Sequence, residues 1–566
     1  MAQWVRRGSL GLAGCFAALM VWVIASTAVN VPLDDEWFDG KGPYLAVRVV
    51  EGRFTVSDLF VPNNTHRIVP TLALTALNTL LFHYDVRVEM LVSGLLTFLN
   101  FVIMAAIWRR TVGEQATIVQ WLSFVILAAM AFSIRQYENW TWGFMNSWFW
   151  VSFFLLCGVY FIQRSQPGWR LLVLLTIFAF ASQFSLGAGI LSWAIFTGML
   201  WLQGERSVLR WLVFLICAGV GAYFLLSIPT VQASLAGDGF NLAPLSFPER
   251  ISRWVGYTLA FIGSVFTGSG WDSVPQATAF GTMGVMVLAG IVFYLWRTRI
   301  TFREMSPWLG IALFGLGSAM LTAIGRERWL ENITPLPVNL RYTPHALYLW
   351  LGLIGLSSLI WGKARQRGVM QFIRLARYMA LIVLIAIGTL QFRMSAAVVD
   401  TLNKRDTNFA LCPYVYALSG NTQCLAELVF NGDEEMVQAQ MDKLLKYQLS
   451  AYSHPPSQPI PLSEMDTNIA FVTIPSHLPF SFEWQVNATL PKGCQSSANL
   501  QLIAQTADGL RQTLASGILS PQASQSTLRA PLDKFKGGPV QLTVEAASSQ
   551  TSCATDLLLY QSVAIH

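Results

Sequence analysis

Two kinds of charged group stand out in this chain, a row of acids near the N-terminus and a set of arginines further along. Asp34, Asp35 and Glu36 follow directly after the first apolar stretch. Acids at a membrane boundary are costly to desolvate, so they mark either a functional site or a solvated helix end. Three adjacent carboxylates also permit a divalent cation such as Mg²⁺ or Mn²⁺, without requiring one.

The arginines occupy one polar segment, residues 325–342, which carries Arg326, Arg328 and Arg341. We predict that this segment is an outer loop, so these arginines are an exception to the positive-inside rule. The planar guanidinium binds phosphate through two parallel hydrogen bonds and keeps its charge in surroundings of low dielectric constant. An anionic ligand at a membrane surface would explain these arginines. Internal pairing with Glu327 and Glu331 is the alternative.

Another polar segment, residues 135–144, mixes aromatic and polar side chains. Trp and Tyr are common at membrane interfaces, so the rings alone indicate little. A row of interfacial aromatic residues does not explain Glu138 and Asn139, which are polar. Carboxylates in one segment and arginines in another are the combination needed to transfer a sugar from a lipid phosphate. A further segment, residues 248–272, surrounds a short apolar helix with charges but shows no motif.

The composition assigns these segments to a membrane protein. The 566 residues are 54% hydrophobic and 12% charged, whereas an average soluble chain has about 25% charged residues. The net charge of +6 is modest, and the basic residues lie in short clusters between apolar stretches, which argues against nucleic acid as a partner. No Cys and His metal spacing, Gly-rich phosphate loop or Ser-His-Asp order stands out, which argues against nucleotide chemistry.

Apolar stretches of about 20 residues, the length that crosses a bilayer, recur from Ser9 to Arg393 and then stop. We predict spanning helices at 9–29, 88–108, 115–134, 147–162, 170–184, 187–203, 209–229, 277–296, 306–324, 343–361 and 377–392. The first resembles a signal peptide, but its apolar core is long and no convincing cleavage site follows, so we expect it to be retained. Residues 67–83 and 254–268 are apolar but short, and they are either spans or helices at the interface.

The distribution of Lys and Arg decides between these two alternatives, because basic residues in short loops stay cytoplasmic. If both short stretches lie at the interface, almost every basic cluster falls on one side. These clusters are Arg6 and Arg7, Arg109 and Arg110, Arg164 and Arg170, Arg206 and Arg210, Arg297 to Arg303, and Lys363 to Arg377. We therefore predict about eleven spans, with the N-terminus in the cytoplasm and the C-terminal region outside.

The polar tail carries four of the seven cysteines, Cys412, Cys424, Cys494 and Cys553. Four cysteines suggest two disulfides and an oxidising compartment, which agrees with the orientation from charge. An apolar stripe predicts a helix at 434–447, and runs at 480–486, 498–504, 540–545 and 557–563 predict short strands. We expect a transmembrane domain at 1–394, a helical region at 395–453, a Pro-rich linker at 454–463 and a β-sandwich-like domain at 464–566.

The order of these features resembles the GT-C glycosyltransferases, particularly bacterial multi-pass proteins with an Asp-Asp pair after the first helix. Their first outer loop ends in an Asn-Glu-His-Arg motif, which is matched by Asn64-Thr65-His66-Arg67 with Thr65 in place of the glutamate. A second pattern is matched by Gln136, Glu138, Asn139, Gly143 and Phe144, and a third by Gly325, Arg326, Arg341 and Tyr342. The resemblance covers roughly residues 1 to 395.

The resemblance implies a fold and a reaction. The fold would be a mainly α, polytopic GT-C-like membrane domain, followed by an extracytoplasmic α+β region that ends in a small β-sandwich. The location would be a bacterial inner membrane. The donor would be a polyprenyl-phosphate sugar, the acceptor a glycan, lipid or protein, and transfer would invert the anomeric carbon.

The resemblance also implies roles for residues. Asp35 or Asp34 would be the general base, with Asp35 favoured. Arg67, Arg326 and Arg341 would stabilise the leaving phosphate. His66, Glu138, Asn139 and Tyr342 complete the predicted substrate-binding set. Some members of the superfamily use a divalent cation and others do not.

Two other classes of protein remain as alternatives. A transporter or flippase would have broken helices or ionisable groups near the middle of the bilayer, whereas the charges here lie at the ends of the spans. A polysaccharide polymerase or ligase also uses lipid-linked glycans and outward-facing arginines. Such an enzyme more often has one large loop between spans than acids directly after the first helix.

Overall fold

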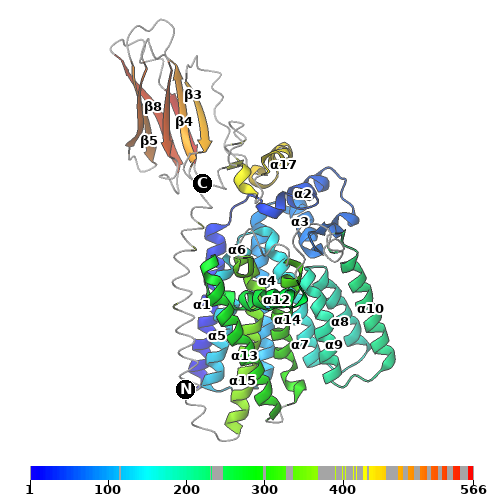
Figure 1. Ribbon diagram of the computed structural model, residues 1–566. Helices are drawn as coiled ribbons and strands as arrows, with labels where there is room; N and C mark the ends of the chain where they lie inside the picture. The colour runs from blue at the N-terminus through cyan, green and yellow to red at the C-terminus, as the bar shows by residue number, and fades with distance from the viewer. Residues whose placement is uncertain are drawn as a thin grey trace. The chain divides into compact units, whose positions relative to one another are not determined.

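The computed structural model describes residues 2–113, 116–229, 231, 246–297, 301–326, 336–366 and 433–453, the strands of the tail, and a few positions between 389 and 429. Within these residues the protein is mainly helical (Figure 1). The chain forms two compact units. Unit 1 comprises Met1–Ala28, Thr55–Thr75 and Arg87–Val399, and unit 2 comprises Val29–Phe54, Ala76–Val86 and Asp400–His566.

Eight helices in the described part of the chain are long and apolar enough to cross a membrane. They are α1 (Ala2–Thr27), α4 (Val86–Val112), α5 (Ile118–Ala131), α7 (Asn146–Arg164), α10 (Val208–Leu226), α13 (Val274–Arg297), α14 (Phe302–Arg326) and α15 (Thr343–Gln366). α5 reaches this length together with the short helices that follow it, η3 (Ile134–Gln136) and α6 (Tyr137–Trp140). Each of the eight coincides with a predicted span, which supports a multi-pass membrane protein.

Two predicted spans form shorter helices. α8 (Trp169–Gln183) has 15 residues, and α9 (Leu191–Leu202) has 12 residues after the turn η5 (Gly187–Ile190). Both pack beside α7, and α8 also contacts α10 (Figure 1). At 1.5 Å per residue, α8 covers about 22 Å of a hydrocarbon core of about 30 Å. The predicted span at 377–392 lies outside the described residues, so the number eleven stays a prediction.

Contacts between helix ends show that the basic clusters of unit 1 gather at one end. Trp308 at the start of α14 donates to Thr111 Oγ1 at the end of α4, at 2.8 Å, and Gln203 after α9 donates to the Ile162 carbonyl near the end of α7, at 2.5 Å. α14 packs directly against α9. The segments joined in this way carry Arg109, Arg110, Arg164, Arg206, Arg210 and Arg303. This grouping agrees with the charge pattern; the assignment of this end to the cytoplasm stays a prediction.

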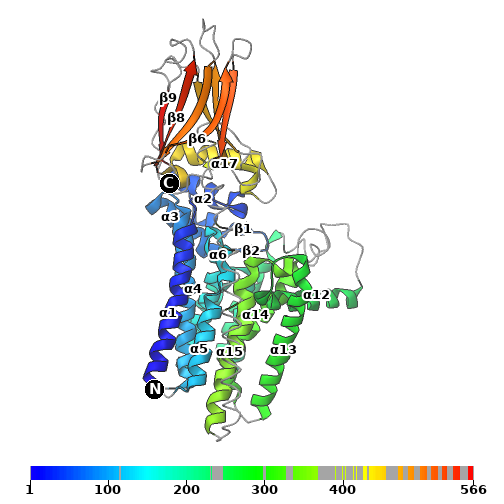
Figure 2. The ribbon, with the colours of Figure 1, turned by 90° about the vertical axis from the view of Figure 1, so that its left-hand side faces the viewer.

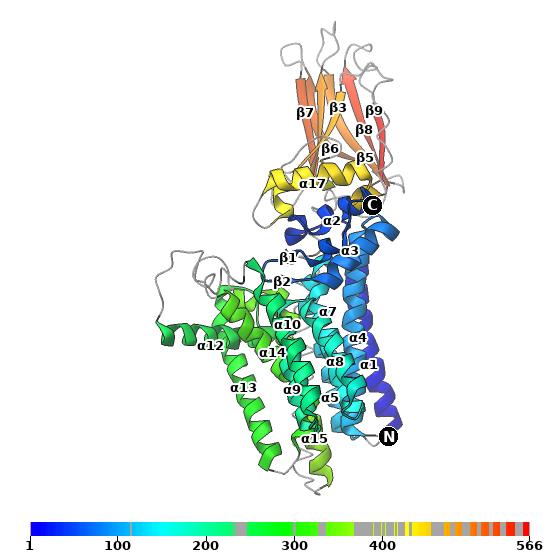
Figure 3. The same ribbon diagram turned by 90° about the vertical axis from the view of Figure 1, so that its right-hand side faces the viewer.

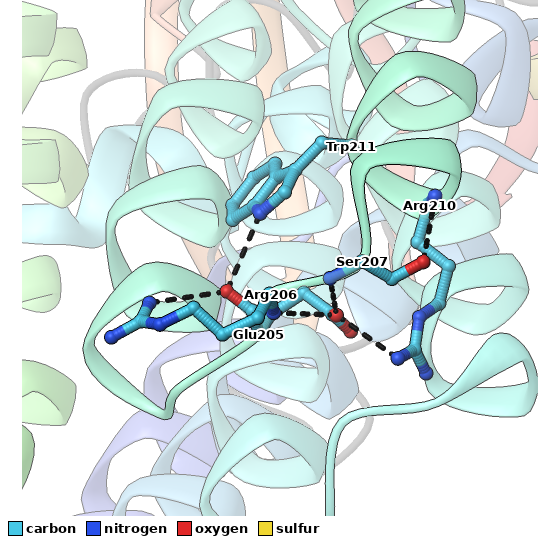
Figure 4. A network of polar contacts seen from close by, with 5 residues as sticks. All are labelled: Glu205, Arg206, Ser207, Arg210 and Trp211. Atoms are coloured by element: carbon cyan, nitrogen blue, oxygen red, sulfur yellow. Dashed lines mark hydrogen bonds and ion pairs between the residues drawn. The ribbon is translucent and has the colours of Figure 1, made fainter.

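A polar network at this end closes the connection between α9 and α10 (Figure 4). The buried Glu205 carboxylate accepts the backbone N–H of Arg206 at 2.8 Å and of Ser207 at 2.7 Å, and it pairs with Arg210 at 3.1 Å. The indole of Trp211 donates to the Glu205 carbonyl at 3.4 Å. Glu205 Oε1 therefore provides an acceptor for two N–H groups directly before α10.

The substitution Glu205→Gln is expected to reduce the stability of the protein by about 1–3 kcal/mol, because a neutral amide oxygen replaces the carboxylate oxygen Oε1 that accepts both N–H groups and pairs with Arg210. Thermal unfolding of the purified protein in detergent measures the effect. Glu304→Gln is the matched control, since Glu304 is exposed at the start of α14. Equal unfolding temperatures of the two variants would contradict the role assigned to Glu205.

α12 (Phe247–Gly263) lies across the ends of the neighbouring helices instead of running alongside them (Figures 2 and 3). It packs closely on α13, because two glycines leave room for the backbones. A β-carbon at Gly263 would overlap the carbonyl oxygen of Ala277, and one at Gly281 would overlap the carbonyl of Leu259. The other short apolar stretch forms α3 (Val69–Phe82), with 14 residues. Neither helix reaches span length, and their place at the interface stays a prediction.

Unit 2 joins part of the first polar loop to the tail. The loop forms η1 (Asp34–Trp37) and α2 (Gly42–Val50), and α2 packs on α17 (Glu434–Tyr447), which has the predicted bounds. Tyr447 donates to Glu51 Oε1 at 2.7 Å, and Ser450 donates to the Asn30 carbonyl at 3.0 Å. These contacts link segments about 400 positions apart in the chain.

The end of the tail forms two antiparallel sheets, one in the order β3-β4-β7 and the other in the order β6-β5-β8-β9. The strands are β3 (Ile469–Pro475), β4 (Phe482–Thr489), β5 (Ala498–Thr506), β6 (Arg511–Leu519), β7 (Gln525–Pro531), β8 (Pro539–Ser548) and β9 (Leu559–Ala564). β4, β5, β8 and β9 overlap the predicted strands. The sandwich itself stays a prediction.

The tail cysteines are described only in part. Cys412 is buried and disulfide-bonded. Cys424, Cys494 and Cys553 lie outside the described residues, so the pairing of the four stays a prediction. Cys15, Cys157 and Cys217, in the apolar helices, are free thiols.

Candidate functional site

The arginine-rich segment ends in a short turn that leads into α15, and this turn is packed by aromatic rings. The turn is η10 (Leu340–Tyr342). The Tyr342 side chain is 3% exposed, and its ring stacks on Phe261 of α12 with 5.2 Å between centroids. Trp148 of α7 meets Tyr342 edge-on at 5.6 Å. The guanidinium of Arg341 lies 5.7 Å from the centroid of the Tyr342 ring.

A second tyrosine, Tyr257 of α12, lies next to this turn. The charges of both predicted arginines influence its pKa. Burial raises the pKa of Tyr257 well above its ordinary value, and the neighbouring Tyr342 adds to this. The positive charges of Arg326 and Arg341 oppose the rise. The charges of Arg326, at the end of α14, and of Arg341, in η10, thus act on the same buried phenol, which the sequence spacing alone did not indicate.

Two residues of the segment 135–144 hold the arginine-rich segment in place. Asn139 is fully buried and donates from Nδ2 to the Leu340 carbonyl at 3.2 Å. Arg135 is also buried, and its guanidinium donates to three carbonyls, those of Thr267, Gly268 and Val338, the last two at 3.2 Å. Arg135 thus joins the loop after α12 to the turn η9 (Leu336–Val338).

Replacing Arg135 by methionine is expected to destabilise the protein by about 3 kcal/mol or more, because three carbonyls lose a charged donor and each unsatisfied buried group costs about 1–3 kcal/mol. Thermal unfolding in detergent measures the loss, and Arg110→Met is the control because Arg110 is exposed. A stable Arg135→Met protein would contradict the anchoring role.

Glu138 is half-buried on α6, and its carboxylate lies near the guanidinium of Arg135. This places one carboxylate of the predicted set beside the anchor of the site. Its predicted role in binding sugar hydroxyls remains a hypothesis.

The His66–Arg67 pair lies in a small hairpin, in which β2 (His66–Arg67) pairs with β1 (Pro62–Asn63). Arg67 is bound to carbonyl and hydroxyl oxygens of the protein. It donates to the Phe60 carbonyl at 3.1 Å, to the Phe224 carbonyl, and to Ser227 Oγ at 3.5 Å. Burial lowers the pKa of Arg67. The structure thus shows Arg67 tying the hairpin to the end of α10.

His66 has more open surroundings. Its Nδ1 lies 3.2 Å from Thr65 Oγ1. Thr65 occupies the position at which the GT-C motif has glutamate. The ring is half-buried.

The first-loop acids differ in their surroundings within unit 2. Glu36 is 1% exposed, and its carboxylate accepts the Leu33 N–H at 3.0 Å, so it caps η1. Asp34 has a φ of +46°, in the left-handed region, and both Asp34 and Asp35 are half-buried. The charge of Asp35 acts on Lys41, whose pKa is lowered mainly by burial. The buried Lys41 thus interacts electrostatically with Asp35, the predicted base.

A cation site built from the first-loop acids finds no support in these surroundings. No group of three or more His, Cys, Asp or Glu side chains in the described part of the chain could hold a metal ion. Glu36 is used as a helix cap. The requirement for a divalent cation stays an open prediction.

Three of these residues were not selected from the sequence. Arg135 is a basic residue on the predicted outer side, and the positive-inside rule offered a signal for it. Lys41 follows the acids by a few positions, which is a weaker signal. Tyr257 lies in a segment without a motif, and only the fold brings it to the arginines.

No protein-family model matches the chain, and no curated protein matches it. Among solved structures, the chain is similar to an oligosaccharyltransferase of Archaeoglobus fulgidus in complex with Zn and sulfate. The two are 9% identical, the match covers 98% of each chain, and the TM-score is 0.33. A likeness at this score supports no conclusion about chemistry, which depends on the residues described above.

Proposed function

We propose that this protein is an inverting membrane glycosyltransferase of the GT-C type, which moves a sugar from a polyprenyl phosphate to an extracytoplasmic acceptor. The observation that supports this most directly is the guanidinium of Arg341, which lies 5.7 Å from the centroid of the buried Tyr342 ring. The positive charges of Arg326 and Arg341 also act on the neighbouring Tyr257. Positive charge beside buried phenols, in a protein with many apolar spans, suits a phosphate attached to a lipid.

The reaction needs a base and an anion-stabilising group. Asp35 takes the proton of an acceptor hydroxyl as its oxygen forms a bond to the anomeric carbon. The bond between that carbon and the phosphate oxygen breaks, and the electron pair leaves with the lipid phosphate. Because negative charge grows on the phosphate, the preplaced Arg326 and Arg341 lower the barrier.

The remaining residues of the predicted set bind or position. Glu138, Asn139 and His66 are candidates to hydrogen-bond hydroxyls of the sugar or the acceptor. Arg67, which already binds three protein oxygens, is assigned to positioning the first-loop hairpin. Asp35 belongs to unit 2 and the two arginines belong to unit 1.

The proposal places the polar ends of the spans on the outer side of a bacterial inner membrane. The basic clusters at the opposite end of unit 1 support this placement through the positive-inside rule. The acceptor is an envelope glycan, a lipid or a protein.

The test is transfer by the purified protein in lipid nanodiscs. A panel of synthetic polyprenyl-phosphate pentoses and hexoses is offered with envelope glycan and lipid acceptors, and the released polyprenyl phosphate is measured by mass spectrometry. Nucleotide sugars form the control panel. Acceptor-dependent release from the lipid donors alone is the expected result.

Two other outcomes would overturn the proposal. Movement of the donor across a vesicle membrane without cleavage would favour a transporter. Transfer of whole glycan blocks from a pyrophosphate-linked lipid would favour a polymerase or ligase.

A further inference from the structure

Tyr257 and Tyr342 carry two buried hydroxyl groups at the same place in the fold. Tyr257 is 4% exposed and Tyr342 is 3% exposed. Apart from the interaction of the two phenols with each other, neither hydroxyl has a hydrogen-bond partner among the described residues. A buried polar group that lacks a partner costs about 1–3 kcal/mol, so two of them beside each other require an explanation.

The surroundings of these hydroxyls are those of an anion site. Phe261 stacks on Tyr342 at 5.2 Å and lies 6.4 Å from Tyr257, so one apolar ring lines both phenols. Arg326 and Arg341 add positive charge at Tyr257. A phosphate oxygen placed there would accept from phenols and guanidinium groups together, and charge-assisted hydrogen bonds are the strong ones.

The position of α12 suits a ligand at a membrane surface. Its first half carries the exposed apolar residues Phe247, Ile251 and Val255, which recur every four positions and so lie on one face of the helix. Such a helix lies in the interface between head groups and acyl chains. Tyr257 follows two residues after this face, on the half of α12 that packs against α13 and α14. The helix thus connects its exposed apolar face to the buried Tyr257.

We infer that Tyr257 is a further substrate-binding residue, and that its hydroxyl and that of Tyr342 donate hydrogen bonds to the phosphate of a lipid-linked ligand. This inference rests on the proposed function and names a residue that the sequence motifs do not contain. A tyrosine hydroxyl is protonated at neutral pH, so Tyr257 can donate a hydrogen bond.

The experiment measures binding of decaprenyl phosphate to the protein in nanodiscs of neutral lipid. The variants are Tyr257→Phe, Tyr342→Phe and the double variant, which remove only hydroxyl oxygens. Tyr160→Phe is the matched control, since its hydroxyl pairs with Arg164 in the basic cluster at the end of α7. Because each hydrogen bond to a charged group contributes about 1.5–3 kcal/mol, the dissociation constant should rise at least tenfold for each single variant.

Two competitors identify the source of the phosphate. Inorganic phosphate and phosphatidylglycerol are each added to the wild-type complex. The inference expects decaprenyl phosphate to remain bound when either is in moderate excess. Displacement of decaprenyl phosphate by phosphatidylglycerol at equal concentration would overturn it in favour of a general lipid-head-group site.

The failure of the inference and the failure of the proposed function give different results. If Arg326→Ala and Arg341→Ala lose binding while the phenylalanine variants bind as the wild type does, the inference is wrong and the proposed function stands. If the wild type does not bind decaprenyl phosphate, the result contradicts both the inference and the proposed function. If the phenylalanine variants also unfold at a lower temperature than Tyr160→Phe while binding is unchanged, the phenols are packing residues.

Discussion

Asparagine at position 35 is expected to slow sugar transfer by about 10²- to 10⁴-fold, the range in which general-base catalysis contributes. The amide has nearly the shape of the carboxylate but does not accept the acceptor's proton. The measurement is the rate of polyprenyl-phosphate release at saturating donor and acceptor. Donor affinity should change much less than the rate, because the lost interaction forms in the transition state.

Asp39→Asn is the matched control for this substitution. Asp39 is an exposed carboxylate in the same loop, so its variant should transfer sugar at the wild-type rate. Asp34→Asn serves as the comparison between the two adjacent acids. A large loss in Asp34→Asn with normal rates in Asp35→Asn would reassign the base to Asp34. Normal rates in both would remove the first-loop base from the mechanism.

Loss of the guanidinium group in Arg341→Ala or Arg326→Ala is expected to lower the rate of transfer by about 10²- to 10³-fold, as the removal of one oxyanion donor does in other enzymes. The lipid phosphate then leaves without its preplaced positive charge. Arg341→Lys should fall between the alanine variant and the wild type, because lysine keeps the charge but not the fork of donors. Release rates with one donor compare the three proteins.

The control for the arginine variants is Arg110→Ala, which removes an exposed arginine at the opposite end of unit 1. Its rate should equal that of the wild type. If Arg341→Ala and Arg110→Ala behave alike while both fold, the phosphate site is misplaced.

The membrane class could be predicted from the sequence because apolar length and charge are local properties of a segment. Eight predicted spans form span-length helices, and α17 has the predicted bounds. The lengths of α8 and α9 could not be predicted in the same way. Apolar residues continue to the end of each segment, whereas the helices end at turns such as η5, whose Gly189 packs against the backbone of Ser182.

The candidate site could be predicted only as a set of residue types. The sequence indicated Arg326 and Arg341 through their exception to the positive-inside rule, and Asp34 and Asp35 through their position after the first helix. It did not indicate that Glu36 caps a turn, because a cap depends on backbone geometry. Nor did it indicate that Arg67 is bound by oxygens more than 150 positions away.

The sequence by itself determined that this is a mainly helical membrane protein with a polar tail, and that acids and arginines are its candidate chemistry. Only the tertiary structure decided which of these groups are neighbours. Arg135 reaches Val338 across 203 positions, and the charges of two distant arginines, Arg326 and Arg341, act on Tyr257. Such contacts depend on how whole helices pack, and helix packing depends on close fits such as the glycines between α12 and α13, which no local pattern records.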